Sequence, residues 1–234
     1  MFSARAFITP LARASVRPRV VCLPLSSRLA SLRAASTISE AITHDHRELQ
    51  KYYNEIVNNQ DDIDHQTRYG NQFTWELARH SVAEELLVYP AMEKYMGDKG
   101  KEHAEHDRKE HHKASLPLLH DHDCRADRPQ TQPFVPKHKE IWSILEHHIE
   151  DEELRDLPAL EEALSSSENR GSSESLAKNF GRTKMFVPSR SHPAAGENPY
   201  FEGPMGMLAA AIDHIADLFR KFPDGVISPN PSKK

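Results

Sequence analysis

The sequence contains little cysteine, with two residues in a chain of 234. Cys22 lies in an N-terminal segment that we interpret below as a cleaved presequence, which leaves Cys124 alone. A single cysteine can form neither a disulfide framework nor a thiolate metal site. Any metal ion in this protein must therefore be held by nitrogen and oxygen atoms.

Long hydrophobic runs are also missing. The longest, such as Gly206–Ile212, are far too short to cross a bilayer, so we expect a protein without a membrane span. The alternation of apolar and polar residues that is typical of β-strands does not occur either. These absences predict an all-α protein, and its length suits one domain of ordinary size with tails.

Acidic residues are absent before Glu40, whereas residues 1–39 contain six arginines and seven serines. This composition matches a mitochondrial transit peptide better than a secretory signal, which needs an apolar core. A disordered basic arm that binds nucleic acid or membrane is the alternative. We expect a transit peptide over residues 1–36 and a location in the mitochondrial matrix. After residue 39 the chain has a net charge of −11, which argues against a nucleic-acid partner.

Four long helices are predicted between residues 37 and 164, which we take as one domain. The segment Thr37–Glu40 has the pattern of a capping box and opens the first helix, which runs to about Asn59. Gly97 marks the end of the second helix, and Pro117 is expected to break or kink the third. The last three helices are expected over residues 65–96, 101–120 and 137–164.

Residues 165–234 are predicted to form a linker and a C-terminal helical extension. The Ser-rich stretch Ser165–Ser175 is expected to be mobile, and the Pro- and Gly-bearing stretch Phe186–Pro204 to be irregular. Pro204 would then start an amphipathic helix that runs to about Phe222. The apolar face of this helix comprises Leu208, Ala211, Ile212, Ile215, Leu218 and Phe222.

The sequence contains an internal repeat. The pattern His-x-x-x-Glu-Glu-x-x-x-x-Pro occurs over His80–Pro90 and again, 68 residues later, over His148–Pro158. Two chance matches to such a pattern in one chain should be rare. Two similar helix pairs are what an up-down-up-down four-helix bundle requires.

Each predicted helix has a stripe of residues at 4-3-4-3 spacing, the pattern of a bundle seam. Every stripe contains one histidine where an apolar residue is expected, and two stripes contain a glutamate four residues later. Buried carboxylates are costly unless they are paired, so cations at their centre explain this set better than a polar core network does. The candidate metal ligands are His46, His80, Glu84, His111, His148 and Glu152.

The third helix offers a choice of histidines, namely His103, His106, His111 and His112. His111 shares the apolar register of Ala104 and Ala114, so we select it as the ligand. His106 shares its face with Glu110 and is the reserve.

These residues resemble the hemerythrin-like family of HHE cation-binding domains over about residues 38–164. The resemblance rests on Asp45-His46, His80 with Glu84-Glu85 and Pro90, Glu110-His111, and His148 with Glu152-Glu153 and Pro158. The segment Arg182–Pro193 is similar to a fungal branch of the family. The resemblance implies a four-helix bundle with a non-haem di-iron centre. In such a centre the four selected histidines would cap two iron ions, and Glu84 and Glu152 would bridge them.

The sequence departs from the oxygen-carrying hemerythrins in one respect. Those proteins place two histidines four residues apart on the third helix, whereas residues 101–124 contain no such pair. The site would be one ligand short, with a more open position, although Asp107 could partly compensate. The Glu-x-x-His pairs of ferritin-type sites and the His-Glu-x-x-His motif of zinc proteases are both absent.

The interpretation we favour is a di-iron protein that binds or senses dioxygen or a related small molecule, or reports iron or redox state, rather than an enzyme. Two alternatives remain open. One is an enzyme that activates oxygen or decomposes peroxide at the open position. The other is a metal-buffering or purely structural bundle.

Overall fold

The computed structural model describes residues 37–119, 134–190, 210–227 and 229. These residues belong to one compact unit, Ala34–Lys234, and form helices and turns without any strand. The described helices are each too short or too polar to span a bilayer. In chain order the elements are α1 (Ile38–Asn58), α2 (Ile63–Ala83), the π-helical turn η2 (Glu84–Val88), α3 (Tyr89–Met96), α4 (Asp98–Leu119), α5 (Phe134–Asp151), the π-helical turn η3 (Glu152–Asp156), α6 (Leu157–Leu164), the short turn η4 (Ser167–Asn169) and α7 (Ser172–Thr183).

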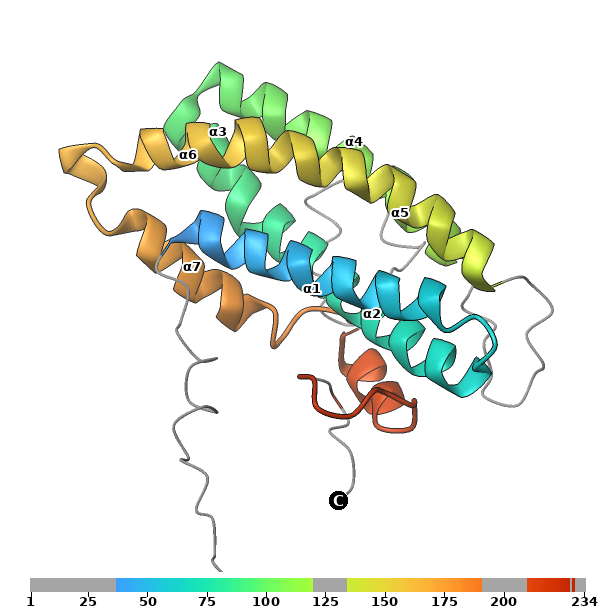
Figure 1. The fold of residues 1–234 in the computed structure, drawn as a ribbon. Helices are drawn as coiled ribbons and strands as arrows, with labels where there is room; N and C mark the ends of the chain where they lie inside the picture. The colour runs from blue at the N-terminus through green and yellow to red at the C-terminus, as the bar shows by residue number, and fades with distance from the viewer. Residues whose placement is uncertain (1–36, 120–133, 191–209, 228, 230–234) are drawn as a thin grey trace, which may run out of the picture. The chain divides into compact units, whose positions relative to one another are not determined.

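Four long rods make up the bundle (Figure 1). α2, η2 and α3 follow one another without a break and form one rod, as do α5, η3 and α6, and α1 and α4 are the other two. α1 packs on α2, α3 on α4, α4 on α5, and both α5 and α6 on α1. The all-α fold and the up-down-up-down bundle predicted from the sequence are thus confirmed.

The predicted helix boundaries are close to the observed ones. Thr37 caps α1 as expected, because its hydroxyl accepts a hydrogen bond from the Glu40 N–H. α2 begins slightly earlier than predicted because Asp62 caps it in the same way. Pro117, which was predicted to break or kink the third helix, does not break it, because the backbone stays helical to Leu119. Most of the loop expected after this helix lies outside the described residues.

The internal repeat has a structural counterpart in the two π-helical turns. In η2 the Tyr89 N–H bonds to the Glu84 carbonyl, and in η3 the Leu157 N–H bonds to the Glu152 carbonyl. The second residue after each turn is a proline, which has no N–H to continue the regular pattern. Single π-helical turns insert one residue into a helix and are frequent at functional sites. The repeat therefore places the same distortion next to both candidate glutamates.

Apolar side chains form two separate clusters along the bundle. One gathers residues from α1, η2, α3, α6 and α7, including Ile42, Met92 and Leu160. The other gathers residues from α1, α2, α4 and α5, including Leu49 and Phe73. Along each helix the candidate histidine comes between residues of the first cluster and residues of the second. The histidines therefore lie between two apolar layers with a low dielectric constant.

The Ser-rich stretch predicted to be mobile is instead structured: it contains η4 and the start of α7. α7 packs on α1 and η2 and buries Ser173, Ala177 and Phe180. The Ser173 hydroxyl also accepts a hydrogen bond from the Ile38 N–H at 2.9 Å, at the start of α1. The 4-3 spacing of these three buried residues was the signal for a helix, but the serine content obscured it.

The predicted C-terminal helix is present over residues 210–217 within the described part of the chain. Its orientation differs from the expectation, because the apolar residues Ile212 and Ile215 are 71% and 61% exposed. The buried face carries Asp213 and Asp217 instead. Both carboxylates accept hydrogen bonds from Ser189, which lies just after α7. These polar contacts, and not an apolar stripe, fix the helix to the rest of the unit.

Candidate metal centre

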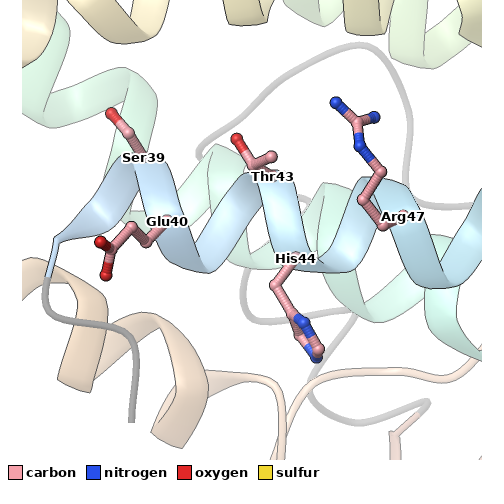
Figure 2. Close-up of a pocket in the computed structure, with 5 residues that line it drawn as sticks. All are labelled: Ser39, Glu40, Thr43, His44 and Arg47. Carbon is pink, nitrogen blue, oxygen red and sulfur yellow. The ribbon is translucent and has the colours of Figure 1, made fainter. Parts of the chain in front are cut away.

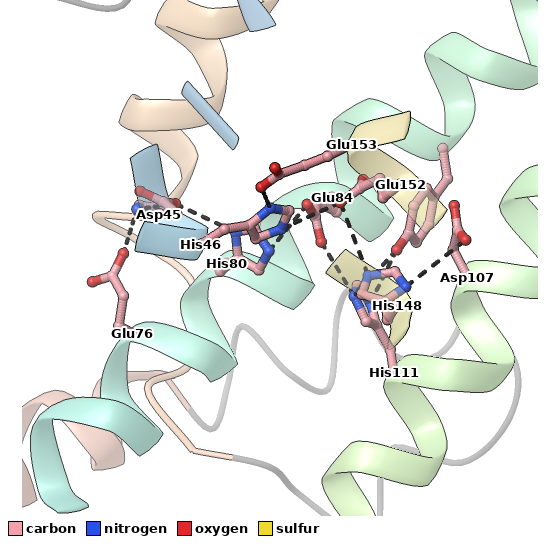
Figure 3. Close-up of polar contacts among 12 residues, drawn as sticks. Asp45, His46, Glu76, His80, Glu84, Asp107, His111, His148, Glu152 and Glu153 are labelled. Carbon is pink, nitrogen blue, oxygen red and sulfur yellow. Dashed lines mark hydrogen bonds and ion pairs between the residues drawn. The ribbon is translucent and has the colours of Figure 1, made fainter. Parts of the chain in front are cut away.

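The six candidate ligands lie together at the centre of the bundle (Figure 3). They come from all four rods, and none is more than 7% exposed. They are His46 from α1, His80 from α2, Glu84 from η2, His111 from α4, His148 from α5 and Glu152 from η3.

Glu84 lies between histidines of two different helices. Its Oε1 atom is 3.1 Å from Nε2 of His80, and its Oε2 atom is 3.3 Å from Nε2 of His111. The two oxygens of one carboxylate thus face opposite sides of the cluster.

Glu152 has a similar position on the second half of the repeat. Its Oε2 atom is 3.3 Å from Nε2 of His46 and 4.0 Å from Nε2 of His148. Each glutamate therefore links one histidine of the first helix pair, α1 and α2, with one histidine of the second pair, α4 and α5.

The side chains form two overlapping groups that could each hold one metal ion. His46, His80 and Glu84 have ligand atoms within 4.8 Å of one another, and so do Glu84, His111 and His148. Atoms bound to one metal ion at about 2.0–2.2 Å lie roughly 3–4 Å apart, which matches the contacts above. Because Glu84 belongs to both groups, the arrangement suits two ions with a shared carboxylate.

Several buried polar atoms in the cluster have no hydrogen-bond partner. They include both carboxylate oxygens of Glu84 and Glu152 and Nε2 of His46. A buried carboxylate without hydrogen bonds is strongly unfavourable unless a cation compensates it. The donor set, imidazole nitrogens with carboxylate oxygens, suits iron, zinc or manganese. The residues present therefore fit a metal pair.

Carboxylates behind the cluster orient three of the four histidines through Nδ1. The pairs are His46 with Glu153 at 2.9 Å, His80 with Asp45 at 3.4 Å and His148 with Glu110 at 3.2 Å. An Nδ1–H donated to a carboxylate leaves the Nε2 lone pair free to face the cluster. Our sequence analysis did not assign this role, although each of these acids is adjacent in sequence to a candidate ligand.

The fourth histidine, His111, contacts a phenol instead. The Tyr89 hydroxyl is 3.1 Å from Nδ1 of His111, and the tyrosine is fully buried. This contact gives the centre one neutral hydrogen-bond donor on the side of α3.

Burial and like charges shift the pKa values in the cluster. Burial, followed by the charges of Glu152 and Asp107, raises the pKa of Glu84 well above its usual value. Burial lowers the pKa of His46, but the contacts with the carboxylates of Glu152 and Glu153 outweigh this effect and bring the pKa to about 9. Burial and the neighbouring His148 hold the pKa of His111 well below normal. Protons thus take the place of the positive charge that a metal ion would supply.

Asp107, which lies one turn before His111 on α4, is buried beside the cluster. Its side chain is 0% exposed, and both carboxylate oxygens lack a hydrogen-bond partner. Its Oδ1 atom is 3.9 Å from Nδ1 of His148. Burial and the charges of nearby carboxylates, Glu152 first, raise the pKa of Asp107 to about 9.

The segment after α7 reaches the rear of the cluster through Lys184. Its ammonium group contacts Asp45, the partner of His80, and lies 2.5 Å from the carboxylate of Glu76. Phe180 from α7 packs edge-on against His80, with 6.0 Å between the ring centroids. The C-terminal extension therefore covers one side of the cluster, which the sequence did not indicate.

The other histidines of the third rod lie outside the cluster. The side chain of His106 is 52% exposed, and His103 pairs with Asp156. His112 is exposed as well. The structure thus brings His111, and not the reserve His106, to the centre of the bundle.

A separate surface hollow lies along α1 (Figure 2). Its lining comprises Ser39, Glu40, Thr43, His44 and Arg47. It offers one histidine and one carboxylate, whereas His46 points from the buried face of the same helix into the cluster. The candidate metal centre is therefore the buried cluster and not this hollow.

Comparison with known proteins agrees with this geometry. The family described as Hemerythrin HHE cation binding domain matches residues 37–160. A hemerythrin-like protein of Schizosaccharomyces pombe is 46% identical over 186 residues, which cover 80% of this chain and 88% of that protein. No solved structure matches. The chain belongs to the hemerythrin HHE cation-binding domain family.

Proposed function

We propose that this protein holds two iron ions in the buried cluster and uses them to bind or sense dioxygen or a related small molecule. One observation carries the proposal. Two groups of ligand atoms share Glu84, and the carboxylate oxygens at their centre have no hydrogen-bond partner. Metal binding follows from the family and the donor set, while the identity of the metal, the number of ions and the small ligand are the proposed part.

In this proposal the six side chains divide into two roles. His46 and His80 would hold one ion, His111 and His148 would hold the other, and the carboxylates of Glu84 and Glu152 would lie between the two pairs of histidines. The short distances from Glu84 to one histidine of each pair support the bridging role. The carboxylates on Nδ1 keep the imidazoles in the tautomer that ligation requires.

Asp107 is the seventh candidate ligand. Its carboxylate lies beside His148 and has no hydrogen-bond partner. If Asp107 does not bind the metal, the site would be one ligand short, and water or a small ligand could occupy that position. A pair of iron ions supplies reversible binding of dioxygen or a related small molecule at such a position.

The surroundings of the cluster favour a small, uncharged ligand. Apolar side chains of the two core clusters close the centre along the bundle axis, and Phe180 covers His80. Tyr89 offers a single hydrogen-bond donor beside His111. A diatomic molecule needs no more than this, whereas an organic substrate would need a wider opening and more polar contacts.

The test is an absorption spectrum of iron-replete protein in the absence and presence of dioxygen. A new visible band that is reversed by removal of dioxygen supports oxygen binding. An unchanged spectrum in protein with two iron ions would favour the buffering or structural alternative. Steady-state turnover of hydrogen peroxide would favour the enzymatic one.

We also propose that residues 1–36 direct the protein to the mitochondrial matrix. The support is compositional: the segment before Glu40 contains six arginines and no acid. This segment lies outside the described residues.

A further inference from the structure

A hollow of about 370 Å³ opens on the surface where α4 meets η3. It is lined by Lys99, Glu102, His103, His106, Asp151, Arg155 and Asp156. Carboxylates and histidines make up most of this lining. Of the two cationic residues, Arg155 is paired with Asp151 at 2.7 Å. The hollow is thus polar and offers several groups that a cation can approach.

Three residues beside this hollow form a group of ligand atoms separate from the inner cluster. His106, Asp107 and Glu110 have one ligand atom each within 4.8 Å of the others. Nδ1 of His106 is 3.6 Å from Oδ1 of Asp107 and 3.9 Å from Oε2 of Glu110. These separations are those of atoms around a single metal ion.

A second observation distinguishes this group from an ordinary acidic surface. The Asp107 side chain is fully buried, and neither of its oxygens has a hydrogen-bond partner. The same Oδ1 atom that faces His106 also lies 3.9 Å from Nδ1 of the inner residue His148. Asp107 is therefore in contact with both the exposed group and the buried cluster.

Glu110 links the two sites in the same way. Its Oε2 atom is 3.2 Å from Nδ1 of His148 and 3.9 Å from Nδ1 of His106. His106 is half exposed, Glu110 is partly buried and Asp107 is fully buried. The three side chains thus form a graded series of ligands from the surface to the interior.

We propose that His106, Asp107 and Glu110 form an outer binding site for a divalent cation, through which metal reaches the buried cluster. The inference that the metal moves on to the buried cluster rests on the proposed function, in which that cluster holds two metal ions. At the outer site, His106 and the two carboxylates would replace some of the water molecules bound to the cation before it moves inward. Asp107 lies on the way inward, because its carboxylate is between His106 and the imidazole ring of His148.

The first experiment separates the rate of metal uptake from the final occupancy. Apoprotein is mixed with Co²⁺, and the increase in visible absorption is followed over time. The wild type is compared with His106→Gln and with the control His112→Gln, which changes another exposed histidine on the same helix. His106→Gln should slow uptake about ten-fold, by analogy with the effect of charged clefts on association rates, and leave the final occupancy of the buried cluster unchanged. Equal rates for all three proteins would overturn the proposed route.

The second experiment tests the outer site without the inner one. In a Glu84→Gln/Glu152→Gln background, which removes both bridging carboxylates, one Co²⁺ ion should still bind weakly. Addition of His106→Gln should abolish this binding, while addition of His112→Gln should not. If the background protein is folded by circular dichroism and binds no Co²⁺, the outer site is refuted. Failure of wild-type protein to hold two ions would instead refute the inner centre, so the two failures are distinguishable.

Discussion

At the scale of single residues, the centre depends on carboxylates that face histidines on two sides. Glu84→Gln should lower the occupancy of both metal ions, because Glu84 is the only residue common to the two groups identified among the described residues. We expect the loss of affinity to reach at least the roughly 10–100-fold typical of changes around metal sites. Elemental analysis after dialysis measures it.

The matched control for this variant is the neighbouring glutamate. Glu85 pairs with Arg108 on α4, outside the cluster. Glu85→Gln should therefore keep two ions per chain. Equal losses in the two variants would show that Glu84 has no special role.

The choice of histidine on α4 is a second prediction at this scale. His111→Ala should impair metal binding, because His111 is 7% exposed and faces Glu84 at 3.3 Å. His106→Ala should leave the final number of bound ions unchanged, since its side chain is half exposed and lies outside the inner cluster. Isothermal titration with Co²⁺ compares the two variants, and a larger loss for His106→Ala would contradict the assignment.

Asp107 makes the stability of the metal-free protein dependent on pH. Burial and neighbouring carboxylates raise its pKa from 3.8 to about 9 in the folded state. Between these values the folded state holds a proton that the unfolded state has released, so the free energy of unfolding falls as pH rises. His46, with its pKa raised to about 9, acts in the same direction above its usual value of 6.5.

The measurement is the urea midpoint of apoprotein from pH 7 to 9. We expect a decrease across this window that is smaller in Asp107→Asn and in metal-loaded protein, where cations replace the protons. A midpoint that is independent of pH in the apoprotein would show that these groups are not protonated in the folded state.

At the scale of elements, α7 and the residues after it stabilise the bundle through buried charge. Lys184 is largely buried and lies between Asp45 and Glu76. Lys184→Met removes the ammonium group from Asp45 and leaves Glu76 with Arg79 alone, and should lower the free energy of unfolding by about 3 kcal/mol. Chemical denaturation tests this value. Lys178→Met, at an exposed position of the same helix, should change it little.

The elements that could be predicted are those whose pattern is local. The 4-3 spacing of Ile42, His46 and Leu49, or of Leu145 and His148, reports which face of a helix is buried, and all five residues are buried in the structure. The same spacing predicted that Tyr53 is the buried tyrosine of the first helix, and this was wrong. Tyr52 is buried instead, with 2% of its surface exposed, while Tyr53 lies at the edge and stacks on Trp142.

The features that could not be predicted depend on contacts between distant parts of the chain. Glu153 meets His46 across 107 positions, and Lys184 meets Asp45 across 139. The spacing of apolar residues within a helix does not indicate which distant residues will form such pairs. The π-helical turns are an intermediate case, because Pro90 and Pro158 were visible in the repeat but were not interpreted as causes of a helical distortion.

At the scale of the whole molecule, the composition of the N-terminal segment predicts import into mitochondria. Residues 1–39 fused to a fluorescent protein should enter mitochondria, since the membrane potential favours inward movement of cationic segments by about 2.3 kcal/mol per charge per 100 mV. The native protein should begin between Ala34 and Ser39. Cytosolic fluorescence, or an intact Met1 on the native protein, would refute this proposal without affecting the metal centre.

The metal content of the purified protein tests the central claim most directly. Protein expressed with ample iron and analysed for iron, zinc and manganese should contain two metal ions per chain, with iron the most abundant. Glu84→Gln should contain markedly less than the wild type under the same conditions. One ion per chain, or none, in folded wild-type protein would contradict a dinuclear centre built on Glu84 and Glu152.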